Sequence, residues 1–168
     1  MFHARIFATD EKYRKKMFKP CAEDRPLVVQ FAANDPDYLL QAAKFVQDDC
    51  DAVDINCGCP QGIAKRGNYG AYLLEQADVI ISLVERLHKE LSIPVTVKIR
   101  CLKTEEDTLA LVKRIEAAGA SMVTVHGRLK EHNKERIVAA NYDIIKRIKQ
   151  TLKIPVIANG GISTFKDV

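Results

Sequence analysis

The sequence has no long apolar run, no secretory leader and no regular cysteine framework. Its apolar stretches stay far below the roughly 20 residues that cross a bilayer, and Met1 to Arg5 lack the apolar centre of a signal peptide. Five cysteines, an odd number without regular spacing, argue against a disulfide scaffold. We therefore expect an intracellular protein, cytoplasmic or nuclear, without a membrane partner, whose thiols serve packing, metal binding or catalysis.

A strong charge imbalance is absent too. The net charge of +4 is only mildly basic, and it does not by itself imply a nucleic-acid partner. With 47% hydrophobic and 29% charged residues, the 168-residue chain has the composition of one globular domain with a sizeable core. Composition and charge therefore do not identify the class of partner, which has to be inferred from the sequence motifs.

Short apolar, β-branched runs alternate with segments of helical periodicity. The runs, with little alternation inside them, predict buried parallel strands at residues 27–31, 52–56, 95–99, 122–126 and 155–158. Helix starts are indicated by Asp35 before Pro36 and by Thr104 before three acidic residues, and Gly119 marks a helix end. The repeating unit is strand, loop, helix, which predicts an α/β fold.

The strand ends decide between a closed (β/α)₈ TIM-barrel and an open doubly wound sheet. If the last polar residue of each strand points inward, the strands deliver one polar group each: Gln30, Asn56, Lys98, His126 and Asn159. Their neighbours would then face the helices: Val29, Ile55, Val97, Val125 and Ala158. Polar strand ends also occur simply where chains meet water, but five different functional groups favour the mouth of a barrel.

The segment 54–60 places Cys59 in a loop just beyond a strand end. Gly58 permits an unusual backbone angle and Pro60 stiffens the turn, so Cys59 is held over the predicted mouth. Lys65 and Arg66 follow closely and can stabilise a thiolate or bind an anion. Cys59 is therefore the candidate catalytic residue.

The cysteines have two other possible roles. Cys57 and Cys59 can form a metal pair, but the second Cys/His pair of a zinc site is missing, so we predict no metal. Small buried core residues are the preferred interpretation for the remaining thiols, Cys21, Cys50, Cys57 and Cys101.

Cationic groups close two further strands. Lys98 with Arg100 and His126 with Arg128 repeat one spacing, which suits an anionic ring or a polyanionic substrate, although single groups of this kind are usually solvated strand ends. The next strand ends in Asn159, Gly160 and Gly161 before a predicted helix start at Ser163, an arrangement that binds phosphate in many barrels or simply makes a tight turn.

These motifs resemble the tRNA-dihydrouridine synthase family in order and spacing over nearly the whole chain. The matching segments are residues 27–31, 54–60 with 64–67, 97–100, 125–128 and 158–161. The segments 65–71 and 32–36 are most similar to the eukaryotic branch that modifies tRNA positions 16/17. The resemblance implies an FMN-dependent oxidoreductase that uses NADPH or NADH to reduce the C5=C6 bond of uridine in the tRNA D-loop.

The resemblance also implies roles for single residues. Cys59 would be the general acid that protonates C5, while hydride reaches C6 from the flavin. FMN contacts would come from Gln30, Lys98, His126, Asn159, Gly160 and Gly161. Substrate contacts would come from Asn56, Lys65, Arg66, Arg100 and Arg128.

A complete barrel takes about 250 residues, so 168 residues predict a partial one. Met1 to Arg5 resemble the end of the family's second strand, so we expect strands two to seven, without strands one and eight and without the C-terminal tRNA-binding helical domain. We also expect this polypeptide alone to bind FMN weakly or not at all, which tight stoichiometric flavin absorbance would refute. Two alternatives stay open: an inactive fragment or incomplete gene product of the family, and another FMN barrel of the dihydroorotate dehydrogenase type.

Overall fold

The computed structural model describes residues 1–132 and 138–167. One parallel sheet contains six strands whose order in space equals their order along the chain. They are β1 (Phe2–His3), β2 (Val28–Ala32), β3 (Ala52–Cys57), β4 (Val95–Arg100), β5 (Met122–His126) and β6 (Val156–Asn159). A doubly wound sheet reverses its strand order at a switch point, whereas a barrel runs in sequence. The fold is therefore a partial TIM-barrel, as predicted.

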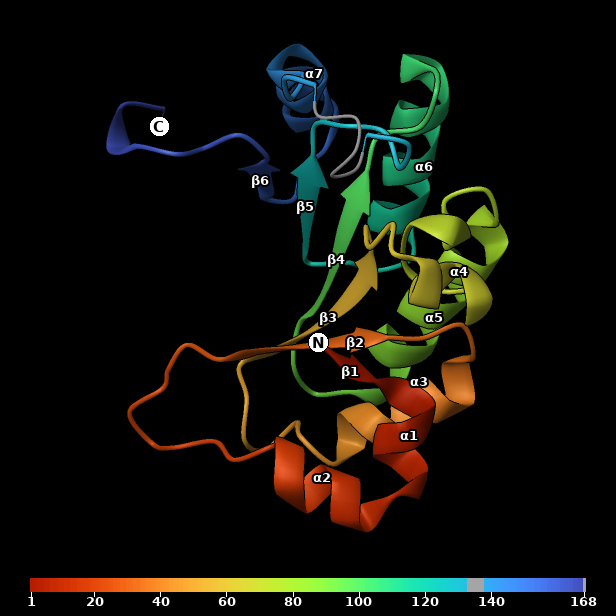
Figure 1. Ribbon diagram of the computed structural model, residues 1–168, viewed down its shortest axis with the longest axis vertical. Helices are drawn as coiled ribbons and strands as arrows, with labels where there is room; N and C mark the ends of the chain where they lie inside the picture. The colour runs from red at the N-terminus through yellow and green to blue at the C-terminus, as the bar shows by residue number, and fades with distance from the viewer. Residues whose placement is uncertain (133–137, 168) are drawn as a thin grey trace.

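Helices cover the outer side of this sheet (Figure 1). They are α1 (Ala4–Thr9), α2 (Glu11–Met17), α3 (Pro36–Lys44), α4 (Gly62–Arg66), α5 (Ala77–Glu90), α6 (Glu105–Ala117) and α7 (Tyr142–Thr151), with 3₁₀ turns η1 (Gly70–Leu73) and η2 (Phe165–Asp167). Contacts run from α1 to α3, α3 to α5, α5 to α6 and α6 to α7, as in the outer ring of a barrel. In the part of the chain described, no helix is long and apolar enough to span a membrane.

The strand residues that face the helices form the core. Val29, Ile55, Val97 and Val125 are buried there, as the alternation predicts. Ala158 pairs with Val125 and so lies on the same side of the sheet, as predicted. It is nevertheless exposed, because residues 160–167 run away from the sheet instead of covering β6 (Figure 1).

The start of the chain also differs from the prediction. The strand expected within residues 1–5 is only Phe2–His3, and the backbone turns into α1 at Ala4. Ala4 and Phe7, three residues apart on this helix, are fully buried, and the Phe7 ring lies 5.3 Å from that of Phe31 in β2. The helix buries both Ala4 and Phe7, and this burial is more favourable than a longer β1.

Short 3₁₀ turns lie next to two of the regular elements. Leu73 ends η1, and α5 begins only at Ala77. The helix start expected at residues 163–168 is a short 3₁₀ turn in which the Asp167 carboxylate accepts hydrogen bonds from the backbone N–H groups of Ser163 and Thr164. Val168 lies outside the described residues.

Candidate active site

Five polar side chains lie on the inner face of neighbouring strands, near their C-terminal ends. Asn56 pairs in register with Lys98, and His126 pairs with Asn159, while Gln30 lies one inward position lower, beside Asp54. All five are at least partly buried. The predicted ring of polar groups is therefore present along one end of the sheet, where the loops of a barrel converge.

Asn56 connects this ring to the loop that carries Cys59. Its side-chain oxygen Oδ1 accepts hydrogen bonds from the backbone N–H groups of Gly58 (3.2 Å) and Cys59 (2.9 Å). Its Nδ2 donates to Oε1 of Gln30 at 3.0 Å. Asn56 thus closes a tight turn that fixes the backbone of Cys59 relative to strand β3.

Residues 70–72 brace the other side of the Cys59 loop. The backbone N–H of Ala71 donates to the carbonyl of Cys59 at 2.9 Å, and the Tyr72 hydroxyl donates to that of Pro60 at 3.0 Å. Gly70 has φ +66°, and a Cβ on it would lie 2.7 Å from the Cys59 carbonyl oxygen. Only glycine allows this close approach. The half-buried Cys59 is therefore held by its surroundings.

Arg100 ties the Cys59 loop to a second loop. Its Nε donates to the carbonyl of Gly58 at 2.8 Å, and its Nη1 donates to the carbonyls of Leu129 (3.0 Å) and His132 (3.1 Å). Arg100 is only 8% exposed. Its predicted substrate contact stays a prediction; the described contacts show a clamp between the loops after β3 and β5.

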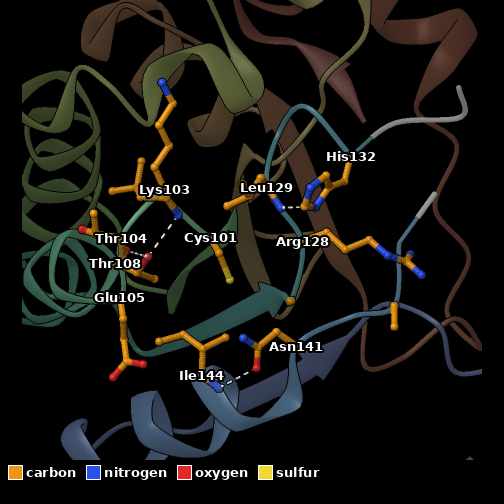
Figure 2. A pocket seen from close by; sticks show the side chains of 13 residues that line it. Cys101, Lys103, Thr104, Glu105, Thr108, Arg128, Leu129, His132, Asn141 and Ile144 are labelled. Atoms are coloured by element: carbon orange, nitrogen blue, oxygen red, sulfur yellow. Dashed lines mark hydrogen bonds between the residues drawn. The ribbon is translucent and has the colours of Figure 1, made fainter. Parts of the chain in front are cut away.

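Near this clamp, Figure 2 shows a cavity of about 270 Å³ between the loops that follow β4 and β5. Cys101 and Arg128 line it together with the first residues of α6 and α7. Burial raises the pKa of the Cys101 thiol to about 11, so it stays protonated at neutral pH. Cys59 is not among the lining residues, so this cavity is separate from the turn that holds Cys59.

His126 is kept neutral by its environment. Burial, followed by the positive charges of Arg100, Lys98 and Arg128, lowers its pKa to about 4. Nη1 of Arg128 lies 3.3 Å from Nε2 of His126, and a guanidinium can only donate. Nε2 is therefore the acceptor, and the proton of the neutral ring is on Nδ1.

Acid is therefore expected to destabilise the protein partly through His126. The folded-state pKa of about 4 lies below the ordinary 6.5, so the unfolded chain binds the proton first. The stability contribution of neutral His126 is complete above pH 6.5 and is lost as the pH falls towards 4. Denaturant unfolding at several pH values should show a shallower acid loss for His126→Gln than for the wild type; parallel curves would contradict this assignment.

Lys98 lies at the same level as Asn56 and is also partly buried. Burial and the charge of Arg100 lower the pKa of Lys98, whereas the nearby Asp54 raises it. Three cations, at positions 98, 100 and 128, thus surround neutral His126. The inner face of β4 and β5 is an electropositive surface that suits an anionic ring or phosphate.

The turn after β6 approaches His126 closely. Gly160 has φ +110°, and a Cβ on it would lie 2.5 Å from Cδ2 and 2.7 Å from Nε2 of His126. Gly161 also has a positive φ, of +78°, and the Tyr142 hydroxyl donates to the Gly160 carbonyl. These glycines place bare backbone beside the imidazole, an arrangement in which a flat ligand or a phosphate can approach the main chain.

Gly160→Ala is expected to lower the free energy of unfolding by about 2 kcal/mol, because a side chain at this backbone angle is strained and would collide with His126. Gly62→Ala is the matched control, since a Cβ on Gly62 would meet nothing within 4 Å and its φ is not positive. Urea denaturation of both variants checks the difference. Equal stability of the two would show that the turn tolerates a Cβ.

The remaining predicted residues lie at the edges of the site. Lys65 and Arg66 are exposed in the last turn of α4, whose Ala64 packs with Tyr69 beside Cys59. Arg128 donates through Nε to the Val138 carbonyl at 2.6 Å. Sequence reasoning assigned no role to Asp54, a buried acid beside Gln30, although its inward parity with Asn56 was visible.

Cys57 is a core residue, as predicted, and Cys50 and Cys101 are buried too, but the same prediction is wrong for Cys21, which is exposed. Cys57 is fully buried on the helix-facing side of β3, and burial raises the pKa of its thiol far above the ordinary value. Within residues 1–132 and 138–167, no three His, Cys, Asp or Glu side chains are grouped so that they could hold a metal ion.

Known proteins are similar in sequence to this chain along almost all of its length. The chain is 48% identical over 173 aligned residues to the tRNA-dihydrouridine(16/17) synthase [NAD(P)(+)] of Saccharomyces cerevisiae, covering all of this chain and 41% of that protein. It is 46% identical to the corresponding synthase-like protein of Mus musculus, of which it covers 36%, and 40% identical to a human tRNA-dihydrouridine(20a/20b) synthase-like protein, of which it covers 53%.

The chain thus spans between about a third and a half of the length of these relatives. The family model described as "Dihydrouridine synthase (Dus)" matches residues 1–168, and therefore every strand and loop of the site described above. The chain belongs to the dihydrouridine synthase family.

Proposed function

We propose that the protein containing this chain is a flavin-dependent tRNA-dihydrouridine synthase that reduces uridine to 5,6-dihydrouridine in the tRNA D-loop. The observation that carries the proposal is the braced position of Cys59 beside the inward polar ring, in a chain that belongs to this family. The named relatives act at positions 16/17 or 20a/20b of tRNA, and the higher identity to the first group favours positions 16/17.

The described residues fit FMN. Gly160 leaves the space beside His126 that a Cβ would fill, and neutral His126 can donate through Nδ1 without adding charge. Lys98 is a partly buried cation whose charged form an anionic ligand would stabilise. We propose that these residues, with Gln30 and the Asn159–Gly161 turn, hold the cofactor, which when bound supplies hydride from NADPH or NADH to uracil C6.

The chain itself supplies the proton and the positioning. The Sγ–H bond of Cys59 breaks, the proton goes to uracil C5, and the thiolate is left near Lys98 and Arg100, whose charges interact with it. Asn56 uses one N–H of its Nδ2 for Gln30, and we propose that the other N–H donates to the uracil. A base must leave its stack to reach such a site.

Cations outside the ring would hold the tRNA. Lys65 and Arg66 are exposed next to the Cys59 loop, and Arg128 lies beside His126. We propose that they contact the phosphate backbone, and that this contact weakens with salt, as counterion release requires. The identity to synthases over the whole chain supports an enzyme more than a non-catalytic remnant.

The proposal is tested with the full-length gene product, NADPH and tRNA transcribed without modifications. Nucleoside mass spectrometry should find dihydrouridine in the D-loop, at positions 16/17. A parallel incubation with orotate and dihydroorotate separates this activity from the dihydroorotate dehydrogenase type. Turnover of dihydroorotate without any dihydrouridine in tRNA would overturn the proposal.

A further inference from the structure

A chain of hydrogen bonds crosses the inner face of three strands and ends at the Cys59 loop. Thr96 in β4 donates through its hydroxyl to Oδ1 of Asp54 in β3 at 2.6 Å. Oδ2 of Asp54 accepts from Nε2 of Gln30 in β2 at 2.7 Å. Gln30 Oε1 accepts from Asn56, whose Oδ1 accepts from the Gly58 and Cys59 backbones.

The backbone N–H groups of Gly58 and Cys59 determine the donor and the acceptor in every hydrogen bond between the Cys59 loop and Asp54. Backbone N–H groups can only donate, so Oδ1 of Asn56 must face Gly58 and Cys59 and its Nδ2 must face Gln30. Gln30 then has to present its oxygen to Asn56 and its Nε2 to Asp54. A group that only accepts is therefore required at Oδ2 of Asp54.

Asp54 is 7% exposed and lies below the ring, so it cannot serve as a surface charge. It also lies far along the chain from the residues it orders: Thr96 is 42 positions away and Gln30 is 24 positions away. Burial of a carboxyl group without partners is costly, and two donors satisfy this one. Such a connected network specifies one arrangement of its members.

Resting on the proposed function of Cys59, we propose that Asp54 is a positioning residue, which orients the amides of Gln30 and Asn56 and so holds the Cys59 turn in place. The described hydrogen bonds of Asp54 go to Gln30 and Thr96, whereas those of the Gly58 and Cys59 N–H groups go to Asn56. The effect of Asp54 is transmitted through the side-chain amides of Gln30 and Asn56. If the Gln30 amide were reversed, its NH₂ group would face the NH₂ group of Asn56, and no hydrogen bond could form between them. The acceptor at Oδ2, and not the negative charge, does the positioning.

Two variants of Asp54 separate acceptor from charge. Asp54→Asn can keep an oxygen towards Gln30 and turn its NH₂ to the Thr96 hydroxyl, so the order of the chain survives without charge. Asp54→Leu has similar size and offers no acceptor. Thr96→Val is the matched control, because it removes one partner of Asp54 but leaves the link to Gln30 intact.

Hydrogen exchange of the full-length protein, followed by mass spectrometry of a peptide spanning residues 57–61, gives the readout. In Asp54→Leu the amides of Gly58 and Cys59 should exchange about fivefold faster, the factor that one net hydrogen bond contributes, while those of α5 stay unchanged. Asp54→Asn and Thr96→Val should exchange like the wild type. Dihydrouridine formation should fall in kcat for Asp54→Leu and recover in Asp54→Asn.

Unchanged exchange in Asp54→Leu, or equal acceleration in Asp54→Asn, would overturn the proposal. If Asp54→Leu does not fold, Gln30→Met interrupts the same chain of hydrogen bonds at its middle. It should accelerate hydrogen exchange at the same two amides. Unchanged exchange in Gln30→Met would also overturn the proposal. The exchange result needs no tRNA turnover. A wild-type protein without synthase activity would therefore refute the proposed function and leave the positioning role standing.

Discussion

Cys59→Ala in the full-length protein is expected to lower the rate of dihydrouridine formation roughly a hundredfold or more, the contribution typical of a positioned general acid. The expectation rests on the turn that holds Cys59 through Asn56, Ala71 and the Gly58 carbonyl. Single-turnover assays with saturating tRNA measure the chemical step. The tRNA affinity should change little, because the thiol is half-buried and small.

Cys21→Ala is the control for the cysteine series, since Cys21 is exposed and lies outside the site. It should keep full activity. Cys59→Ser separates proton donation from packing, because a hydroxyl has similar size but is a much weaker acid. If Cys59→Ala forms dihydrouridine at the wild-type rate, another group protonates C5 and the role of Cys59 is only structural.

Arg100→Met is expected to have the largest effect on stability. Three backbone carbonyls, of Gly58, Leu129 and His132, lose a charged donor, and bonds of this kind contribute about 3 kcal/mol to the free energy of unfolding when they are buried together. The loops after β3 and β5 should then separate, so activity should fall as well. Guanidinium denaturation measures the first effect and the tRNA assay the second.

Arg147→Met is the matched control for Arg100. Arg147 in α7 pairs with Glu105 at 2.6 Å, but its side chain is 61% exposed, and surface pairs contribute only about 0–1 kcal/mol. The two variants remove the same charge and add the same side chain. Equal losses of stability would mean that the clamp seen at Arg100 adds nothing beyond an ordinary surface contact.

The inward ring was predictable from the sequence because strand geometry has a period of two. Once Asn56 and Lys98 are assigned to strand ends, the inward side of each strand follows from parity, and the register of β3 and β4 confirms that they pair. The repeat of strand, loop and helix left both a barrel and a doubly wound sheet open, and the polar strand ends favoured the barrel, whose strands run in sequence. The fold class was therefore predictable without a single tertiary contact.

The partners of Arg100 were not predictable in this way. Its acceptors lie 29 and 32 positions away at Leu129 and His132, and they are backbone carbonyls, which every residue possesses. No side-chain pattern marks such a contact. The helix at residues 4–9 was missed for another reason: it is short, and the burial of Phe7 depends on Phe31 in another strand.

For Asp54, the alternation of side chains along a strand predicts the orientation of the residue but not its role. Its position two residues before Asn56 predicts an inward side chain, and the structure confirms a buried one. Its meaning depends on the orientation of Gln30, which is fixed only when three strands are assembled. Sequence patterns locate such residues, whereas the direction of a hydrogen-bond chain needs the structure.

The most direct test of the account is to measure dihydrouridine in the tRNA of cells that lack the gene and carry either the wild-type copy or the Cys59→Ala copy. Nucleoside mass spectrometry of D-loop fragments should detect dihydrouridine at positions 16/17 only with the wild-type copy. Equal dihydrouridine with both copies would contradict the role of Cys59. Its absence with both, from a stably expressed wild-type protein, would contradict the proposed function.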